Sequence, residues 1–134
     1  MTLTFLLIDD CVPYREILRK MVEAHRGWKV SAEAGDGTEG VSQAMHHNPD
    51  VALVDINLPQ MNGIETARRL KQMFPNLLVI TFSGHHDLEY FYASQRAGAN
   101  GHFRKEELDT AFLENLINTH CVILQAMRCA PNLI

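Results

Sequence analysis

Cysteine is scarce in this sequence, and its placement argues against two common uses of the residue. The cysteines are Cys11, Cys121 and Cys129, an odd number with no C-x-x-C spacing. A disulfide framework needs paired cysteines, and a structural zinc site needs clustered ligands. We therefore expect reduced thiols in a cytoplasmic protein.

The sequence also lacks a basic excess and any long apolar run. Its 12 lysines and arginines are outnumbered by 16 aspartates and glutamates, which gives a net charge of −4. Because nucleic-acid binding needs a basic face, no direct contact with nucleic acid is expected. No stretch reaches the roughly 18 apolar residues of a membrane span, and no charged-then-apolar leader is present. We expect neither a membrane segment nor a signal peptide.

Repeats, low-complexity segments and linkers rich in proline, glycine or serine are absent as well. A chain of 134 residues, 46% of them hydrophobic, suits one domain with a real core. We predict a single domain over residues 1–134, with its core at about 3–119 and a C-terminal helical extension or tail at 120–134.

What the sequence does contain is a regular alternation of short apolar runs and helical patterns. The run Val51–Val54 is apolar throughout, which is typical of a strand buried on both faces of a parallel sheet. Helical spacing follows each run and ends at signals such as Gly27 and Pro75. We predict strands at 4–8, 28–34 (an edge strand), 51–55, 77–83 and 99–104, and helices at 13–26, 41–48, 62–74, 87–97 and from about Glu107 through Leu124.

This (βα)5 order implies an α/β fold with a parallel sheet and helices on both faces. All strands then end at one edge, where open α/β sheets bind ligands. The residues at this edge are Asp9 and Asp10 after the first strand, Asp55 after the third, Ser83 after the fourth and Lys105 after the fifth. Each alone has an ordinary explanation, as a strand-end turn residue, a helix cap or a solvated lysine. Their placement at successive strand ends favours a functional site.

The chemistry of this set points to phosphoryl transfer. Three crowded carboxylates repel one another, so their pKa values rise unless a cation is bound. Mg²⁺ accepts a few carboxylates, a backbone carbonyl and several waters. Lys105 can neutralise phosphoryl oxygens, Ser83 can donate a hydrogen bond, and Asp55 can attack phosphorus.

The sequence is similar to the receiver domains of two-component response regulators. The matching motifs, within about residues 3–118, are Leu7-Ile8-Asp9-Asp10, Val54-Asp55-Ile56-Asn57-Leu58-Pro59 with Met61-Asn62-Gly63, Ser83-Gly84, and Gly98-Ala99-Asn100-Gly101-His102-Phe103-Arg104-Lys105. The resemblance implies a flavodoxin-like three-layer sandwich with a five-stranded sheet of order 2-1-3-4-5. It also implies that a histidine kinase or phosphotransfer protein supplies the phosphoryl group, with Mg²⁺ as cofactor, and that a downstream protein responds.

The resemblance assigns a role to each residue of the set. These are Asp55 as phosphoacceptor, Asp9 and Asp10 as the acidic pair with Asp10 favoured as the direct Mg²⁺ ligand, Asn57 as the backbone-carbonyl ligand, Ser83 as the switch hydroxyl and Lys105 as the family's lysine. Three residues before the lysine the family usually has Tyr or Phe, and this sequence has His102. His102 is either a tolerated substitution or a titratable switch ring. His85 lies where relatives tune dephosphorylation, and no direction is predicted for it.

Residues 120–127 continue the last helix with an apolar composition. They form either a locally packed tail or a surface for homodimer formation. Gel filtration of a chain cut after Thr119 distinguishes the two, because an unchanged apparent mass would exclude the dimer.

Two other functions fit the same build. A Mg²⁺-dependent phosphohydrolase with an aspartyl nucleophile usually has a second acid two residues later, and Asn57 stands there instead. A receiver-fold adaptor that is never phosphorylated would not need the full set of acids, serine and lysine. We therefore predict a regulatory phosphoacceptor domain and not an enzyme.

Overall fold

The computed structural model describes residues 2–84 and 88–129, with side chains described up to residue 120. Five parallel strands form one sheet in the order β2-β1-β3-β4-β5. The strands are β1 (Leu3–Ile8), β2 (Trp28–Ala34), β3 (Val51–Asp55), β4 (Leu78–Ser83) and β5 (Gly101–Arg104). The predicted flavodoxin-like order is confirmed, including the edge position of β2.

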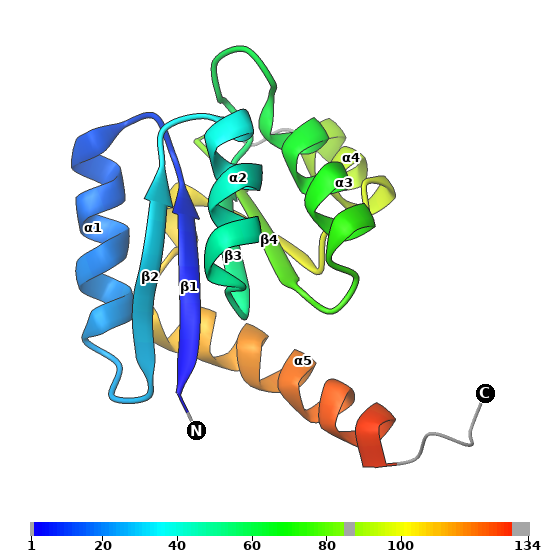
Figure 1. The fold of residues 1–134 in the computed structure, drawn as a ribbon. Coiled ribbons are helices and arrows are strands. Elements are labelled where there is room, and N and C mark those ends of the chain that lie inside the picture. Colours follow the sequence, from blue (N-terminus) through cyan, green and yellow to red (C-terminus); the bar gives the residue numbers. More distant parts are fainter. Residues whose placement is uncertain (1, 85–87, 130–134) are drawn as a thin grey trace.

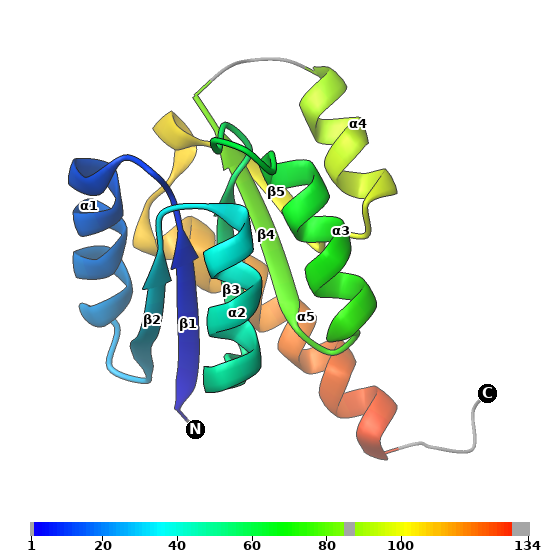
Figure 2. The same ribbon diagram turned by 45° about the horizontal axis from the view of Figure 1, so that its top comes forward.

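Helices cover both faces of this sheet, which gives three layers. They are α1 (Val12–Glu23), α2 (Gly37–His47), α3 (Gly63–Met73), α4 (Leu88–Arg96), α5 (Thr110–Cys129) and a short 3-10 turn, η1 (Lys105–Glu107). Helices α1 and α5 lie on one face, and α2, α3 and α4 on the other (Figures 1 and 2). Within the described part of the chain, no helix combines the length and apolarity needed to cross a bilayer.

Alternation along the strands divides the core into two halves. Leu7, Leu53 and Ile80 pack on one side of the sheet, together with buried residues of α1 and α5. Ile8 and Val54 pack on the other side, against α2 and α3. Because both faces of these strands are buried, polar side chains are accommodated where the strands end. The packing of the core therefore places the candidate site at the carboxyl ends of the strands.

The last helix begins later than predicted. Glu107, the expected start, is instead the last residue of η1, and residues 108 and 109 are not helical. The backbone N–H of Arg104, which precedes η1, donates to Glu107 Oε1 at 3.1 Å. Helix α5 begins at Thr110, and the N–H of Phe112 donates to Asp109 Oδ1 at 2.7 Å. An aspartate that accepts this bond is a strong start signal, and it overrides the helical pattern before it. Side chains from residue 121 onward lie outside the description, so self-association through α5 stays a prediction.

Helix α4 exposes several of its large apolar residues to solvent. The predicted helix is present from Leu88, although its expected start at Asp87, like His85, lies outside the described residues. Leu88, Phe91 and Tyr92 are 70%, 41% and 51% exposed, while the buried residue of the helix is Ser94. Packing of α4 on the sheet therefore depends less on large apolar side chains than on Ser94, although the Phe91 ring still meets His102 of β5 edge to face at a centroid distance of 6.3 Å.

Candidate functional site

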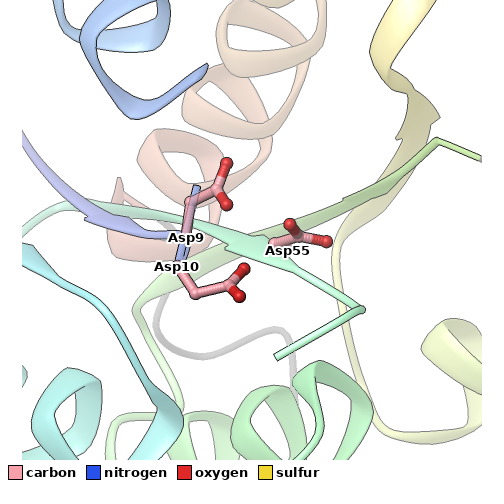
Figure 3. Close-up of side chains that lie close together, drawn as sticks. All are labelled: Asp9, Asp10 and Asp55. Atoms are coloured by element: carbon pink, nitrogen blue, oxygen red, sulfur yellow. The ribbon is translucent and has the colours of Figure 1, made fainter. Parts of the chain in front are cut away.

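The strand register brings the predicted site residues to one edge of the sheet. Ile8 pairs with Val54 and Asp55 with Phe82, so the ends of β1, β3 and β4 lie side by side. Figure 3 shows Asp9 and Asp10 leaving the end of β1 and Asp55 leaving the end of β3.

Three carboxylates meet at this edge. Asp9, Asp10 and Asp55 each offer one oxygen, and these oxygens lie within 4.8 Å of one another. Asp9 is fully buried and Asp55 is 2% exposed, whereas Asp10 faces solvent. The cluster therefore has two buried acids and one acid open to the outside, an arrangement that a hard cation entering from solvent can reach.

Hydrogen bonds hold one oxygen of each buried acid. Asp9 Oδ1 accepts from the N–H of Cys11 and Asp55 Oδ1 from the N–H of Asn57, both at 2.9 Å. Asp9 Oδ2 is buried and has no partner among the described residues. Burial raises the pKa of Asp9 from 3.8 to about 7; the Cys11 N–H lowers this pKa, and the charge of Asp55 raises it. A buried acceptor without a donor is costly, and a bound cation would satisfy it.

Lys105 supplies the positive charge of the site. Its Nζ lies 3.4 Å from Asp55 Oδ2. The same ammonium lies 4.4 Å from the ring centroid of Tyr14 and 5.7 Å from that of Phe82. The residue after the fifth strand thus reaches the residue that ends the third, as the strand-end pattern predicts.

The remaining predicted residues border this cluster. Ser83 is fully buried at the end of β4, and next to it a Cβ built on Gly84 would meet no atom within 4 Å. Asn57 is exposed and donates its backbone N–H to Asp55. Ser83 and Asn57 therefore lie at the same edge as the acids.

Two supports of the site were not foreseen from the sequence. Arg15 Nη1 donates to the backbone oxygen of Asp9 at 2.6 Å while its Nε donates to Glu33 Oε1 at 2.9 Å, which ties the ends of β1 and β2 together. Gly63 donates its N–H to the oxygen of Ile56 at 2.9 Å, so the loop after Asp55 folds back closely. A Pro-x-Met-Asn-Gly turn hints at the second contact, but no sequence signal points to the first.

His102 lies in a polar cluster between the sheet and α4. Its Nδ1 is 2.7 Å from Thr81 Oγ1 and 3.5 Å from Ser94 Oγ, and Thr81 Oγ1 donates to Ser94 Oγ at 2.8 Å. Burial lowers the pKa of His102, and Glu107 opposes that shift. The ring is therefore neutral at neutral pH and links β4, β5 and α4.

We expect His102 to make the fold less stable in mild acid. Since its pKa is lower in the folded than in the unfolded chain, the unfolded chain binds more protons, and stability falls as the pH drops below about 6.5. Urea unfolding at about pH 7.5 and about pH 5.5 should show a larger acid loss for the wild type than for His102→Phe, which keeps a ring but cannot titrate. Equal losses would show that His102 titrates alike in both states.

A family model supports the assignment of the fold. The model described as response regulator receiver domain matches residues 5–117. Among solved structures, a LuxR-family two-component response regulator from Aurantimonas sp. SI85-9A1 superposes with a TM-score of 0.81 at 30% identity, covering 89% of this chain and 84% of that one. A CheY-like receiver domain protein from Methanospirillum hungatei JF-1 gives a TM-score of 0.82 at 24% identity, over 94% of this chain and 99% of that one, and this likeness shows the fold alone.

Curated relatives are longer than this chain. The transcriptional regulatory protein DegU of Brevibacillus brevis is 35% identical over 108 residues, which are 81% of this chain and 46% of that protein. The nitrate/nitrite response regulator protein NarL of Escherichia coli K12 is 31% identical over 103 residues, 77% of this chain and 48% of that protein. The chain thus spans about half the length of these relatives, and the residues matched by the family model include every side chain of the site described above.

Proposed function

Because this chain belongs to the response regulator receiver domain family, we propose that it accepts a phosphoryl group on Asp55 from a histidine kinase or phosphotransfer protein. The observation that carries this proposal is the position of Asp55, which ends β3 with Lys105 Nζ 3.4 Å from its Oδ2 and two further carboxylates beside it. A lone strand-end aspartate would have neither.

The residues present also fit Mg²⁺. Asp10, Asp9, Asp55 and the backbone carbonyl of Asn57 would hold the ion together with waters, and the unpaired oxygen Asp9 Oδ2 is the observation that favours this. When bound, the ion supplies charge neutralisation at the phosphoryl oxygens.

The chain's own residues perform the transfer by positioning and charge. A carboxylate oxygen of Asp55 forms the new O–P bond while the bond between phosphorus and the donor breaks, and the electron pair leaves with the donor group. Lys105 faces the equatorial oxygens with a compact ammonium, and the Ser83 hydroxyl donates to one of them. The N–H of Asn57 holds the other oxygen of Asp55 during the attack.

The outcome of the transfer is regulatory. A phosphoryl group adds negative charge at the edge of β3 and β4, and this charge favours an altered arrangement of Ser83, α4 and β5. The output is a changed affinity for a downstream protein or for a second copy of the chain through α5. The named relatives are transcriptional regulators about twice as long as this chain. In a longer protein of that kind, the responding partner would be another segment of the same polypeptide. The receiver domain itself is acidic and is not expected to bind nucleic acid.

Intact-mass measurement after incubation with a small phosphodonor and Mg²⁺ tests the proposal. The wild type should gain one phosphoryl group per chain, and Asp55→Asn should gain none. Asp109→Asn is the matched control, because this exposed residue starts α5 and asparagine caps a helix equally well. No gain in the wild type would favour an unphosphorylated adaptor, and many turnovers of a phosphoester per chain would favour a phosphohydrolase.

A further inference from the structure

The ammonium of Lys105 lies between a carboxylate and an aromatic ring. Asp55 Oδ2 is 3.4 Å from Nζ on one side, and the ring centroid of Tyr14 is 4.4 Å from it on another. The Tyr14 ring packs in turn on Phe82, with centroids 5.6 Å apart and planes at 43°. Tyr14 comes from the first turn of α1, an element that contributes no residue to the family motifs quoted above.

We infer that Tyr14 is a positioning residue that holds the Lys105 ammonium beside Asp55 for phosphoryl transfer. This inference rests on the proposed function of Asp55. It adds a contact from α1 to a site otherwise built from strand ends.

The physical reason lies in what a lysine needs at such a site. Its ammonium is a compact, strongly hydrated charge on a flexible four-carbon stem, so without a second contact it would sample many positions in water. The face of an aromatic ring attracts a cation without carrying a formal charge. Unlike another carboxylate, Tyr14 therefore restrains Lys105 without neutralising the charge that incoming phosphoryl oxygens require.

The phenol hydroxyl is not what performs this role. Tyr14 Oη is buried and has no hydrogen-bond partner among the described residues. Burial raises the pKa of Tyr14, and the negative charges of Asp9 and Asp55 raise it further, so the hydroxyl stays protonated and neutral. The ring face is the part that contacts Lys105, and phenylalanine should therefore replace tyrosine here, whereas leucine should not.

The rate of labelling by a small phosphodonor with Mg²⁺ tests the inference on the full chain. Tyr14→Leu should label about 5- to 10-fold more slowly than the wild type, the size expected for one partly desolvated cation–π contact. Tyr14→Phe should recover at least about half of the wild-type rate, because it restores the ring face. Ile17→Leu, at an exposed residue of the same helix, is the control and should label like the wild type.

A double-mutant cycle separates positioning from a merely structural role. If Tyr14 acts through Lys105, Tyr14→Leu should cause no further slowing in a Lys105→Met background. Equal slowing in both backgrounds, or a wild-type rate in Tyr14→Leu, would overturn the inference.

The contact can also be measured without phosphoryl transfer. The ε-methylene protons of Lys105 should show an upfield ring-current shift by NMR in the wild type and in Tyr14→Phe. The shift should be much smaller in Tyr14→Leu, where only the more distant Phe82 ring remains, 5.7 Å from Nζ. Absence of the shift in the wild type would overturn the inference by itself. A wild type that shows the shift but takes no label would refute the proposed function and, with it, the role of Tyr14 in transfer, while leaving the contact established.

Discussion

Replacement of Gly63 by alanine should destabilise the fold by about 3 kcal/mol or more. A Cβ at this position would overlap the backbone oxygen of Asp55 and lie 2.5 Å from Ile56 Cα and 2.7 Å from the carbonyl carbon of Asp55. These are backbone atoms of β3 and the turn after it, which cannot rotate away as a flexible side chain could. The chain must therefore separate α3 from the end of β3 to accommodate one methyl group.

Urea unfolding of Gly63→Ala and Gly84→Ala provides a matched comparison. A Cβ at Gly84 would meet nothing within 4 Å, so this variant should stay within about 0.5 kcal/mol of the wild type. Any folded Gly63→Ala should also be labelled poorly on Asp55, because the displaced backbone carries the phosphoacceptor. Equal unfolding midpoints for the two variants would contradict the close packing of α3 on β3.

The second large effect concerns Asp9 and divalent metal. In metal-free protein at about pH 7.5, Asp9→Asn should raise the free energy of unfolding by about 2 kcal/mol. The reason is that the pKa of Asp9 is raised from 3.8 to about 7 in the fold, so its ionised form is disfavoured there. Because the fold favours the protonated form of Asp9, this residue contributes stability that is fully present below pH 3.8 and is lost as the pH rises through about 7. Asparagine remains neutral throughout this window.

Added Mg²⁺ should reverse the order of the two proteins. The wild type should gain thermal stability from Mg²⁺, and more at about pH 7.5 than at about pH 5, where protons compete for Asp9. Asp9→Asn should gain much less at either pH. Glu23→Gln, an exposed acid at the far end of α1, is the control and should respond like the wild type. A Mg²⁺ response that Asp9→Asn leaves unchanged would exclude Asp9 from the metal site.

Much of the site follows from the sequence because topology leaves little choice. Parallel strands that alternate with helices must all end at one edge of the sheet. The acids at the ends of β1 and β3 and the lysine after β5 are therefore brought to the same edge by the backbone alone. The strand order itself followed from the family resemblance, since apolar runs do not say which strand pairs with which.

Contacts that depend on the direction of a side chain could not be predicted from the order of strands and helices. Tyr14 belongs to an apolar helical pattern that suits a core residue equally well, and its position over Lys105 appears only in three dimensions. In α4 the apolar pattern marks the exposed side, while a small polar residue, Ser94, faces the sheet. Here a hydrogen bond to Thr81 replaces the apolar packing that periodicity assumes.

The manner in which α4 is attached affects the free energy of moving it. Most helices of this fold cannot leave the sheet without transferring apolar side chains into water, at a cost that grows with the area exposed. The large apolar residues of α4, Leu88, Phe91 and Tyr92, are already hydrated to a large degree. Displacing this helix therefore costs the side-chain hydrogen bonds at Ser94 and the edge-to-face contact of Phe91 with His102, whose ring centroids lie 6.3 Å apart. A net hydrogen bond contributes only about 0.5–1.5 kcal/mol. A charge placed at the strand ends need supply only a small free energy to shift α4, far less than global unfolding requires.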